Sequence, residues 1–305
     1  VHHSSSPQLQ PEELLHLPPS PPPPPPPPRP AIALVSLIYY YTLSLHLVIA
    51  AAASNDSSAD MSALLEFAGG IRQAGGASSA SGGASSASPG CDPSLSWTSD
   101  AANDDDPCAW CGISCDGDGA VVSVQLAGLG LLGSLRPGSL SSLRRLADLD
   151  LSSNSLSGPI PEDLAGLSPT LLRLDLSGNA FTGPVPFTLG GLSALLHLSL
   201  ASNRLQGPIP SSLGALPNLT SLNLSSNSLH NPIPLELSQI RSLQALDLHS
   251  NRLSGSIDPV FLAFPSLVSV DLSDNQLSGF LPWQPNDTLP LLKTLQYVNL
   301  SHNHL

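Results

Sequence analysis

Four cysteines are the residues of this chain with the most specific chemistry. They are Cys91, Cys108, Cys111 and Cys115, and they lie within a span of 25 residues. An even number of closely spaced cysteines is typical of a disulfide-bonded segment in a secreted protein. The alternative is a zinc site, but Cys108 and Cys111 form one C-x-x-C pair and no second pair faces it. The spacing therefore favours two disulfides, without showing which cysteines pair.

Aspartates gather near these cysteines, and a glycine motif follows them. The aspartates are Asp104, Asp105, Asp106, Asp116 and Asp118. They lack the ordered alternation of an EF-hand loop, so we expect no calcium site.

The segment 128–133 matches G-x-G-x-x-G, the motif of dinucleotide-binding sites. Such a site needs a helix that opens at the glycines, but Pro137 and Gly138 break the stretch that follows. We therefore expect neither a metal nor a cofactor.

The chain lacks the motifs of common catalytic sites. H-E-x-x-H, G-x-S-x-G and Walker A strings are absent, and the nine histidines are scattered. No kinase motif is present, so any kinase-like domain of the full protein lies beyond Leu305. The net charge is −13, with 10 Lys and Arg residues and no basic cluster, which argues against a nucleic-acid partner. The sequence predicts a protein that recognises partners and is not an enzyme.

An asparagine recurs at a nearly constant period along the second half of the chain. It belongs to a repeating L-x-x-L-x-L-x-x-N-x-L-x-G-x-I-P string, with spacings of 25, 24, 24, 24, 24 and 28 residues. The seven positions are Asn154, Asn179, Asn203, Asn227, Asn251, Asn275 and Asn303. This is the period of leucine-rich repeats, whose units stack and share one core. We therefore expect a solenoid.

Within one unit, the leucines and the asparagine have different tasks. Leu198 and Leu200 alternate with Ser199, which predicts a short strand with one buried face. Asn203 follows where the strand turns away, and its side-chain amide can satisfy buried backbone groups of the turn. An earlier unit spans residues 121–143, so we expect eight strands in all.

Two segments carry a family resemblance. Leu146–Pro161 resembles the plant-type leucine-rich repeat of receptor-like kinases and receptor-like proteins, and D-P-C-A-W-C-G-I-S-C at Asp106–Cys115 is similar to their N-terminal cap. The resemblance implies an α/β solenoid, a right-handed leucine-rich-repeat superhelix with a parallel concave β-sheet and a disulfide-bonded N-terminal cap. It also implies a Cys108–Cys115 bond. Cys111 is extra, and we expect Cys91 as its partner, although the sequence leaves this pairing open.

The chain divides into four parts by composition. Residues 1–30 hold a proline run that cannot form a core. Residues 31–53 are an apolar stretch that ends in small residues, typical of a cleaved signal peptide, with an uncleaved signal anchor as the alternative. We expect residues 54–119 to form the cap and residues 120–305 to form about eight repeats. Because the last unit is incomplete, we expect the natural protein to continue towards a transmembrane helix.

A helix is expected at the start of the cap. Asp60 can cap it, and apolar residues recur at i, i+3, i+4 and i+7. These residues are Leu64, Phe67, Ala68 and Ile71. Such a cap would seal the apolar end of the solenoid, as a terminal unit must.

Residues that alternate with the core leucines face the concave surface of a leucine-rich-repeat sheet. Interface hot spots favour Trp, Tyr and Arg, and this surface is polar, acidic and poor in aromatic residues. The expected partner-binding residues are Arg173, His197, His249 and Tyr297. Glycosylation sequons lie at Asn55, Asn218, Asn223, Asn286 and Asn299. Glycans at Asn223 and Asn299 would mask the concave surface.

The resemblance also implies a function. It indicates the extracellular domain of a plant leucine-rich-repeat receptor-like kinase, which binds a peptide or protein ligand or a leucine-rich-repeat co-receptor in cell-surface signalling. The repeat filler around Asp247–Asn251 is similar to the branch whose kinase is predicted inactive. This function places the protein in the secretory pathway and on the extracellular face of the plasma membrane. The alternative is a free secreted protein that inhibits cell-wall-degrading enzymes.

Overall fold

The computed structural model describes residues 57–73, 106–257, 264–279 and 294–305. The expected proline-rich part, the signal segment at residues 31–53, Cys91, Asn55 and Asn286 lie outside these ranges. Within them, none of the helices combines the length and the apolar character that a bilayer crossing requires.

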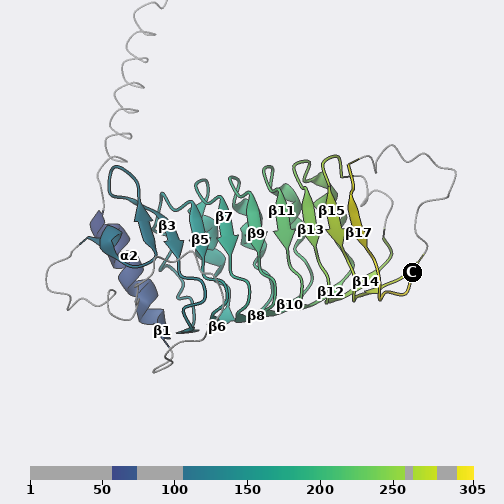
Figure 1. Cartoon of the computed structure of the whole chain (residues 1–305), viewed down its shortest axis with the longest axis horizontal. Coiled ribbons are helices and arrows are strands. Elements are labelled where there is room, and N and C mark those ends of the chain that lie inside the picture. The colour runs from purple at the N-terminus through teal and green to yellow at the C-terminus, as the bar shows by residue number, and fades with distance from the viewer. Residues whose placement is uncertain (1–56, 74–105, 258–263, 280–293) are drawn as a thin grey trace, which may run out of the picture. The chain divides into compact units, whose positions relative to one another are not determined.

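The nine-stranded sheet contains one strand from each of the eight expected repeats (Figure 1). Its repeat strands are β3 (Val121–Gln125), β5 (Asp148–Asp150), β7 (Arg173–Asp175), β9 (His197–Ser199), β11 (Ser221–Asn223), β13 (Ala245–Asp247), β15 (Ser269–Asp271) and β17 (Tyr297–Asn299). All of these pair in parallel, and β2 (Ile113–Cys115) of the cap adds an antiparallel strand beside β3. The predicted solenoid with a parallel sheet is confirmed.

A second, eight-stranded sheet was not expected from the sequence. It contains β1 (Ile71–Gln73), β4 (Leu131–Gly133), β6 (Ser155–Pro159), β8 (Ala180–Gly183), β10 (Arg204–Gly207), β12 (Ser228–Asn231), β14 (Arg252–Gly255) and β16 (Gln276–Leu277). Its strands follow the asparagine column of the repeats, except β1 of the cap, which pairs antiparallel with β4. Four of these strands, β4, β8, β10 and β14, end at a glycine with positive φ, such as Gly207 at +93°. Asn231 replaces that glycine at φ +75°, which asparagine tolerates better than most residues.

Short 3₁₀ helices complete the repeats on the side away from the nine-stranded sheet. They are η2 (Glu162–Leu167), η3 (Phe187–Gly191), η4 (Ser211–Ala215) and η5 (Leu235–Gln239). Each begins directly after the repeat proline, whose φ lies between −61° and −67°. A stretch of five or six residues gives one tight turn and no room for an α-helix, so the only α-helix of the described residues lies in the cap.

The leucine columns form one continuous core. In the β9 repeat, Leu195, Leu198, Leu200 and Leu205 are each no more than 1% exposed. Such burial stabilises by about 1.5–3 kcal/mol for each leucine side chain. The same columns are buried in the repeats from β3 to β15, whereas in the β17 repeat Val298 is 42% exposed and Leu295 and Leu300 are only partly buried.

The asparagine ladder forms as predicted. The Asn203 amide donates to the carbonyls of Leu200, Ala201 and Leu176, and Asn203 Oδ1 accepts from the Phe181 N–H. Leu176 and Phe181 belong to the preceding repeat, so each asparagine closes its own turn and also fastens it to its neighbour. The same bonds recur at Asn154, Asn179, Asn227, Asn251, Asn275 and Asn303.

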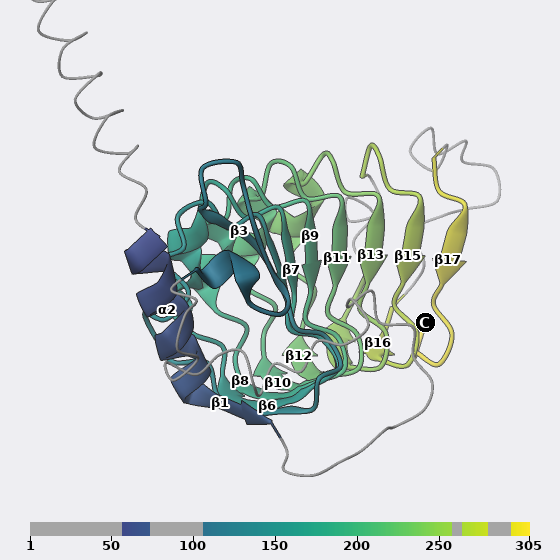
Figure 2. The same cartoon turned by 60° about the vertical axis from the view of Figure 1, so that its left-hand side comes forward.

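The cap covers the end of the core with helix α2 (Ser57–Gly70), as Figure 2 shows. Leu64 and Phe67 are fully buried against the repeat core. Two details of our prediction were wrong. The helix begins at Ser57, so Asp60 lies inside its first turn, where Oδ2 accepts from the Val121 N–H at 2.9 Å. Ile71 lies beyond the helix, which ends at Gly70, and begins β1.

The cap contains the disulfide that the resemblance implied. Cys108, in η1 (Pro107–Ala109), is bonded to Cys115 at the end of β2, with their Cα atoms 5.6 Å apart. Cys111 is also disulfide-bonded. Its expected partner, Cys91, lies outside the described residues, so that pairing stays a prediction.

Candidate ligand-binding surface

The open face of the nine-stranded sheet, which we predicted to be concave, carries the polar residues in straight columns. Strand register places Asp150 opposite Asp175, Asn223 opposite Asp247, and Asp247 opposite Asp271. The complete central column is Gln125, Asp150, Asp175, Ser199, Asn223, Asp247, Asp271 and Asn299. Because neighbouring strands lie about 4.8 Å apart, this column forms a continuous polar track.

Most carboxylates and amides of this column have a structural task at one oxygen. Asp175 Oδ1 accepts from the Ser177 N–H at 3.0 Å and from the Ser177 hydroxyl at 2.6 Å, which closes the turn after β7. The same bonds join Asp150 to Ser152, Asn223 to Ser225, Asp271 to Ser273 and Asn299 to Ser301. Only the second oxygen or the amide nitrogen of each side chain is left for other partners.

Arg173 forms ion pairs with the aspartates near the N-terminal end of the track. Its Nη1 lies 2.9 Å from Asp150 Oδ2, and its Nη2 lies 2.9 Å from Asp175 Oδ2. Asp148 Oδ1 lies 3.6 Å from Nη1, which is close enough for an ion pair but not for a hydrogen bond. Burial raises the pKa of Asp150, but the hydrogen bonds from Ser152 and Arg173 outweigh it and hold this pKa below its ordinary value.

Asp271 lies among neutral donors near the C-terminal end. Its Oδ2 accepts from the Tyr297 hydroxyl at 3.1 Å and from Asn299 Nδ2 at 3.0 Å. Burial raises the pKa of Asp271, but the bonds from Ser273, Asn299 and Tyr297 lower it further. The same bond to Asp271 raises the pKa of the Tyr297 hydroxyl. Asp271 therefore remains ionised without a cationic partner among the described residues.

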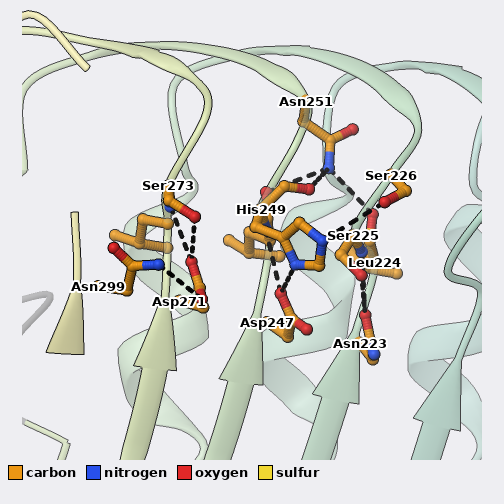
Figure 3. A network of polar contacts seen from close by, with 12 residues as sticks. Asn223, Leu224, Ser225, Ser226, Asp247, His249, Asn251, Asp271, Ser273 and Asn299 are labelled. Carbon is orange, nitrogen blue, oxygen red and sulfur yellow. Dashed lines mark hydrogen bonds and ion pairs between the residues drawn. The ribbon is translucent and has the colours of Figure 1, made fainter. Parts of the chain in front are cut away.

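Asp247, His249 and Ser226 form a chain that has the order of a hydrolase triad (Figure 3). His249 Nδ1 lies 2.6 Å from Asp247 Oδ1, and His249 Nε2 lies 3.5 Å from Ser226 Oγ. A triad also needs free N–H groups beside the serine for the oxyanion. Here the Ser226 N–H donates to the His249 carbonyl and the Asn227 N–H donates to the Ser250 carbonyl. The arrangement therefore holds a turn and does not provide a catalytic site.

A pocket of about 270 Å³ opens on the face between β11 and β17. Its polar lining consists of Asn223, Asp247 and Asp271, with Tyr297 at the β17 side. Its small residues are Ser221, Ala245 and Ser269, which occupy one register column. Among these groups, Asp247 Oδ2 and Asn223 Nδ2 make no hydrogen bond to any described residue, so both are open to a ligand.

The structure does not bring the four expected partner-binding residues together. Tyr297 lines the pocket, and His249 lies beside it through Asp247. His197 is exposed on β9, in register with Arg173 on β7, away from the pocket lining. Arg173 is engaged with three aspartates. The sequence did not distinguish Asp247 as a contact, because its context resembles that of Asp150, Asp175 and Asp271 in three other repeats.

Two of the sequons also lie on this face. Asn223 lines the pocket, and Asn299 donates to Asp271. Asn218 is exposed elsewhere, and its amide donates to the Ser193 carbonyl at 2.9 Å. Glycosylation of these asparagines remains a prediction.

Family models support the repeat assignment. A leucine-rich-repeat model matches residues 169–229, and a second model matches residues 145–167, 242–264 and 266–286. Among curated proteins, the LRR receptor-like serine/threonine-protein kinase GSO2 of Arabidopsis thaliana is 45% identical over 64 residues, which cover 21% of this chain and 5% of that protein. Other matches in the same organism include receptor kinases described as inactive. The chain thus matches only a small part of these curated relatives.

Solved structures extend the likeness over more of the chain. The Arabidopsis receptor kinase HAESA, in complex with the peptide hormone IDA and the co-receptor SERK1, is 32% identical over 80% of this chain and 41% of that chain, with a TM-score of 0.61. A pollen receptor kinase 3 is 30% identical over 66% of this chain and 96% of that chain, with a TM-score of 0.56. A plant ice-binding protein also matches at 28% identity, over 81% and 71% of the two chains, with a TM-score of 0.64, so the fold alone does not assign a function. With its repeats, its cap and these relatives, the chain belongs to the plant-type leucine-rich-repeat family, the family of the receptor-kinase ectodomains that it matches.

Proposed function

We propose that this chain is the extracellular ligand-binding part of a plant leucine-rich-repeat receptor-like kinase, and that it binds a peptide or protein ligand on the open face of the nine-stranded sheet. The observation that carries the proposal is the in-register polar track with a pocket at its C-terminal half. An extended peptide that follows the track would meet one side chain every 4.8 Å or so.

The relatives support this reading. HAESA was solved with a peptide hormone and a co-receptor, so an ectodomain of this fold can hold both. We propose the same two partner classes for this chain. The kinase, its activity and a membrane anchor lie outside this proposal.

The location follows from the proposed role. The Cys108–Cys115 disulfide fits an oxidising compartment. We propose that residues 31–53 direct the chain into the secretory pathway and that its repeats act at the extracellular face of the plasma membrane. A free inhibitor of cell-wall-degrading enzymes has less support, because the named curated relatives are receptor kinases.

The test is selection of linear peptides from a random displayed library on the full chain secreted from plant cells. Ser199→Trp adds bulk to the middle of the open face, and Gln206→Trp adds the same bulk to an exposed position of β10 in the other sheet. We expect selected peptides to lose binding to the first variant and to keep it with the second. Failure to select any peptide, or equal binding to both variants, would contradict the proposal.

A further inference from the structure

We propose that the pocket between β11 and β17 receives a cationic side chain of the ligand, best matched by an arginine. This inference rests on the proposed function and names the chemistry that the open face recognises. Its basis is an internal template, because the same protein already fills the equivalent space in its N-terminal half with an arginine of its own.

The template is the site of Arg173. On β5 and β7, the register partners Asp150 and Asp175 each give Oδ2 to one nitrogen of the Arg173 guanidinium, at 2.9 Å. Arg173 lies two residues before Asp175 on the same strand. The planar guanidinium thus makes a charge-assisted bond to each of two neighbouring carboxylates.

The pocket repeats the pair of register-partner aspartates without the arginine, and Ala245 stands where Asp148 lies beside Arg173. Asp247 and Asp271 are register partners on β13 and β15, as Asp150 and Asp175 are on β5 and β7. The residue two before Asp271 is Ser269, which occupies the position of Arg173 and lines the pocket. A short serine leaves open the space that the arginine side chain fills in the other half.

The hydrogen bonds show the same correspondence. Asp150 Oδ2 binds Arg173, whereas the equivalent Asp247 Oδ2 binds no described residue. Asp271 Oδ2 is shared by Tyr297 and Asn299, which are neutral donors and leave its negative charge uncompensated. A guanidinium would therefore bond directly to Asp247 and be attracted to Asp271 at short range.

Tyr297 places an aromatic ring at the β17 side of the pocket. Its hydroxyl is held by Asp271, and its ring therefore extends from β17 across β15 towards the central column. A cation over the face of such a ring is attracted by the negative charge of its π system. The pocket volume of about 270 Å³ suits one side chain and not a larger ligand.

A metal ion is a poorer occupant of the pocket. No group of three or more potential ligating side chains occurs among the residues that the structure describes. Two carboxylates with an aromatic ring and an alanine suit an organic cation better, because hard metal ions need several oxygen ligands.

The test uses the full secreted chain and two acetylated pentapeptide amides, Gly-Gly-Arg-Gly-Gly and the same peptide with citrulline in place of arginine. Citrulline has nearly the same shape and no charge. We expect the arginine peptide to bind about tenfold more tightly, as followed by NMR titration. We also expect Asp247→Asn to remove this preference and Glu236→Gln, which removes an exposed charge on η5, to keep it.

A gain-of-occupancy variant gives a second check. Ser269→Arg should place an arginine in the pocket as Arg173 does in its own half, so it should abolish peptide binding while the melting temperature is kept or raised. Equal binding of the two peptides, no detectable binding of either, or full binding to Ser269→Arg would overturn the inference. Library peptides that bind the open face without any basic residue would overturn the inference about the pocket and leave the proposed function standing. Failure to select any peptide would count against the proposed function itself.

Discussion

The N-terminal and C-terminal halves of the open face share the same repeat backbone, but they differ in how the charges of their aspartates are balanced. On β5 and β7, the aspartates of the central column share Arg173. On β13 and β15, the equivalent aspartates have no Lys or Arg partner within the described ranges, because Ser269 stands where Arg173 would. The asparagine ladder does not differ between the halves, whereas the turn after β13 has His249 in place of the serine that bonds the aspartate elsewhere. In this repeat protein, therefore, one spacer position determines whether a pair of carboxylates stabilises the fold or remains open to a partner.

The largest effect should come from the part that both halves share. Asn179→Ala and Asn251→Ala each leave backbone groups of two repeats unpaired, so each should lower the free energy of unfolding by about 3 kcal/mol. Ser199→Ala, which changes only a spacer on the open face, should change it by less than about 0.5 kcal/mol. Chemical unfolding of the secreted chain measures all three, and equal midpoints would show that the ladder is not structural.

A smaller effect on the free energy of unfolding should distinguish the half that contains Arg173. Arg173→Met leaves three aspartates close together without a cation, and we expect a loss of about 1–2 kcal/mol, reduced from the cost of a buried pair because Arg173 is partly exposed. Arg204→Met, at an exposed site on β10 that makes no ion pair with a described residue, is the matched control and should be neutral. Addition of Asp150→Asn to Arg173→Met should recover part of the loss. Absence of recovery would mean that the arginine acts by packing alone.

The pH dependence of the unfolding free energy should also reveal the ion pair of Arg173. The pKa of Asp150 lies below its ordinary value of 3.8, so its pairing stabilises the fold above that pH, and the stabilisation is lost as the pH falls through the lowered pKa. The difference in unfolding free energy between wild type and Arg173→Met should therefore be constant above about pH 5 and shrink towards pH 2. A difference that stays constant over this whole range would exclude the ion pair as its source.

The half without an arginine should respond in the opposite direction, with a smaller change in the free energy of unfolding. Asp247→Asn removes one of two like charges on neighbouring strands, and we expect a gain of a few tenths of a kcal/mol. A loss of 1 kcal/mol or more would show that the contact of Asp247 with His249 depends on the carboxylate charge, and the two halves would then be alike.

The smallest effect concerns Tyr297. Its hydrogen bond to Asp271 raises the pKa of the phenol above 10.0. Asp271→Asn should bring this pKa down, which an alkaline absorbance titration can follow, with Tyr297→Phe to identify the signal. An unchanged titration would mean that the ring is not held over the pocket.

Local repetition explains how much of this fold could be predicted. Leu198 and Leu200 alternate with a serine, and Asn203 recurs in register, so burial and turn bonding follow from each unit and its neighbours alone. The cap cysteines Cys108 and Cys115 lie seven residues apart, near enough for a family pattern to indicate the bond. The eight repeat strands and the open face with its polar columns were therefore predictable.

The second sheet and the difference between the two halves were not. The segment after each asparagine is too short and too rich in glycine and proline to predict a strand, and it becomes one only when β10 finds β8 and β12 beside it. The contact of Arg173 with Asp150 joins residues 23 positions apart, while similar aspartates occur in four repeats. The sequence by itself determined which residues enter the core and which face outward, because that depends on alternation along one strand. Only the tertiary structure decided which outward charges meet, because that depends on the register of neighbouring strands and the reach of a single side chain.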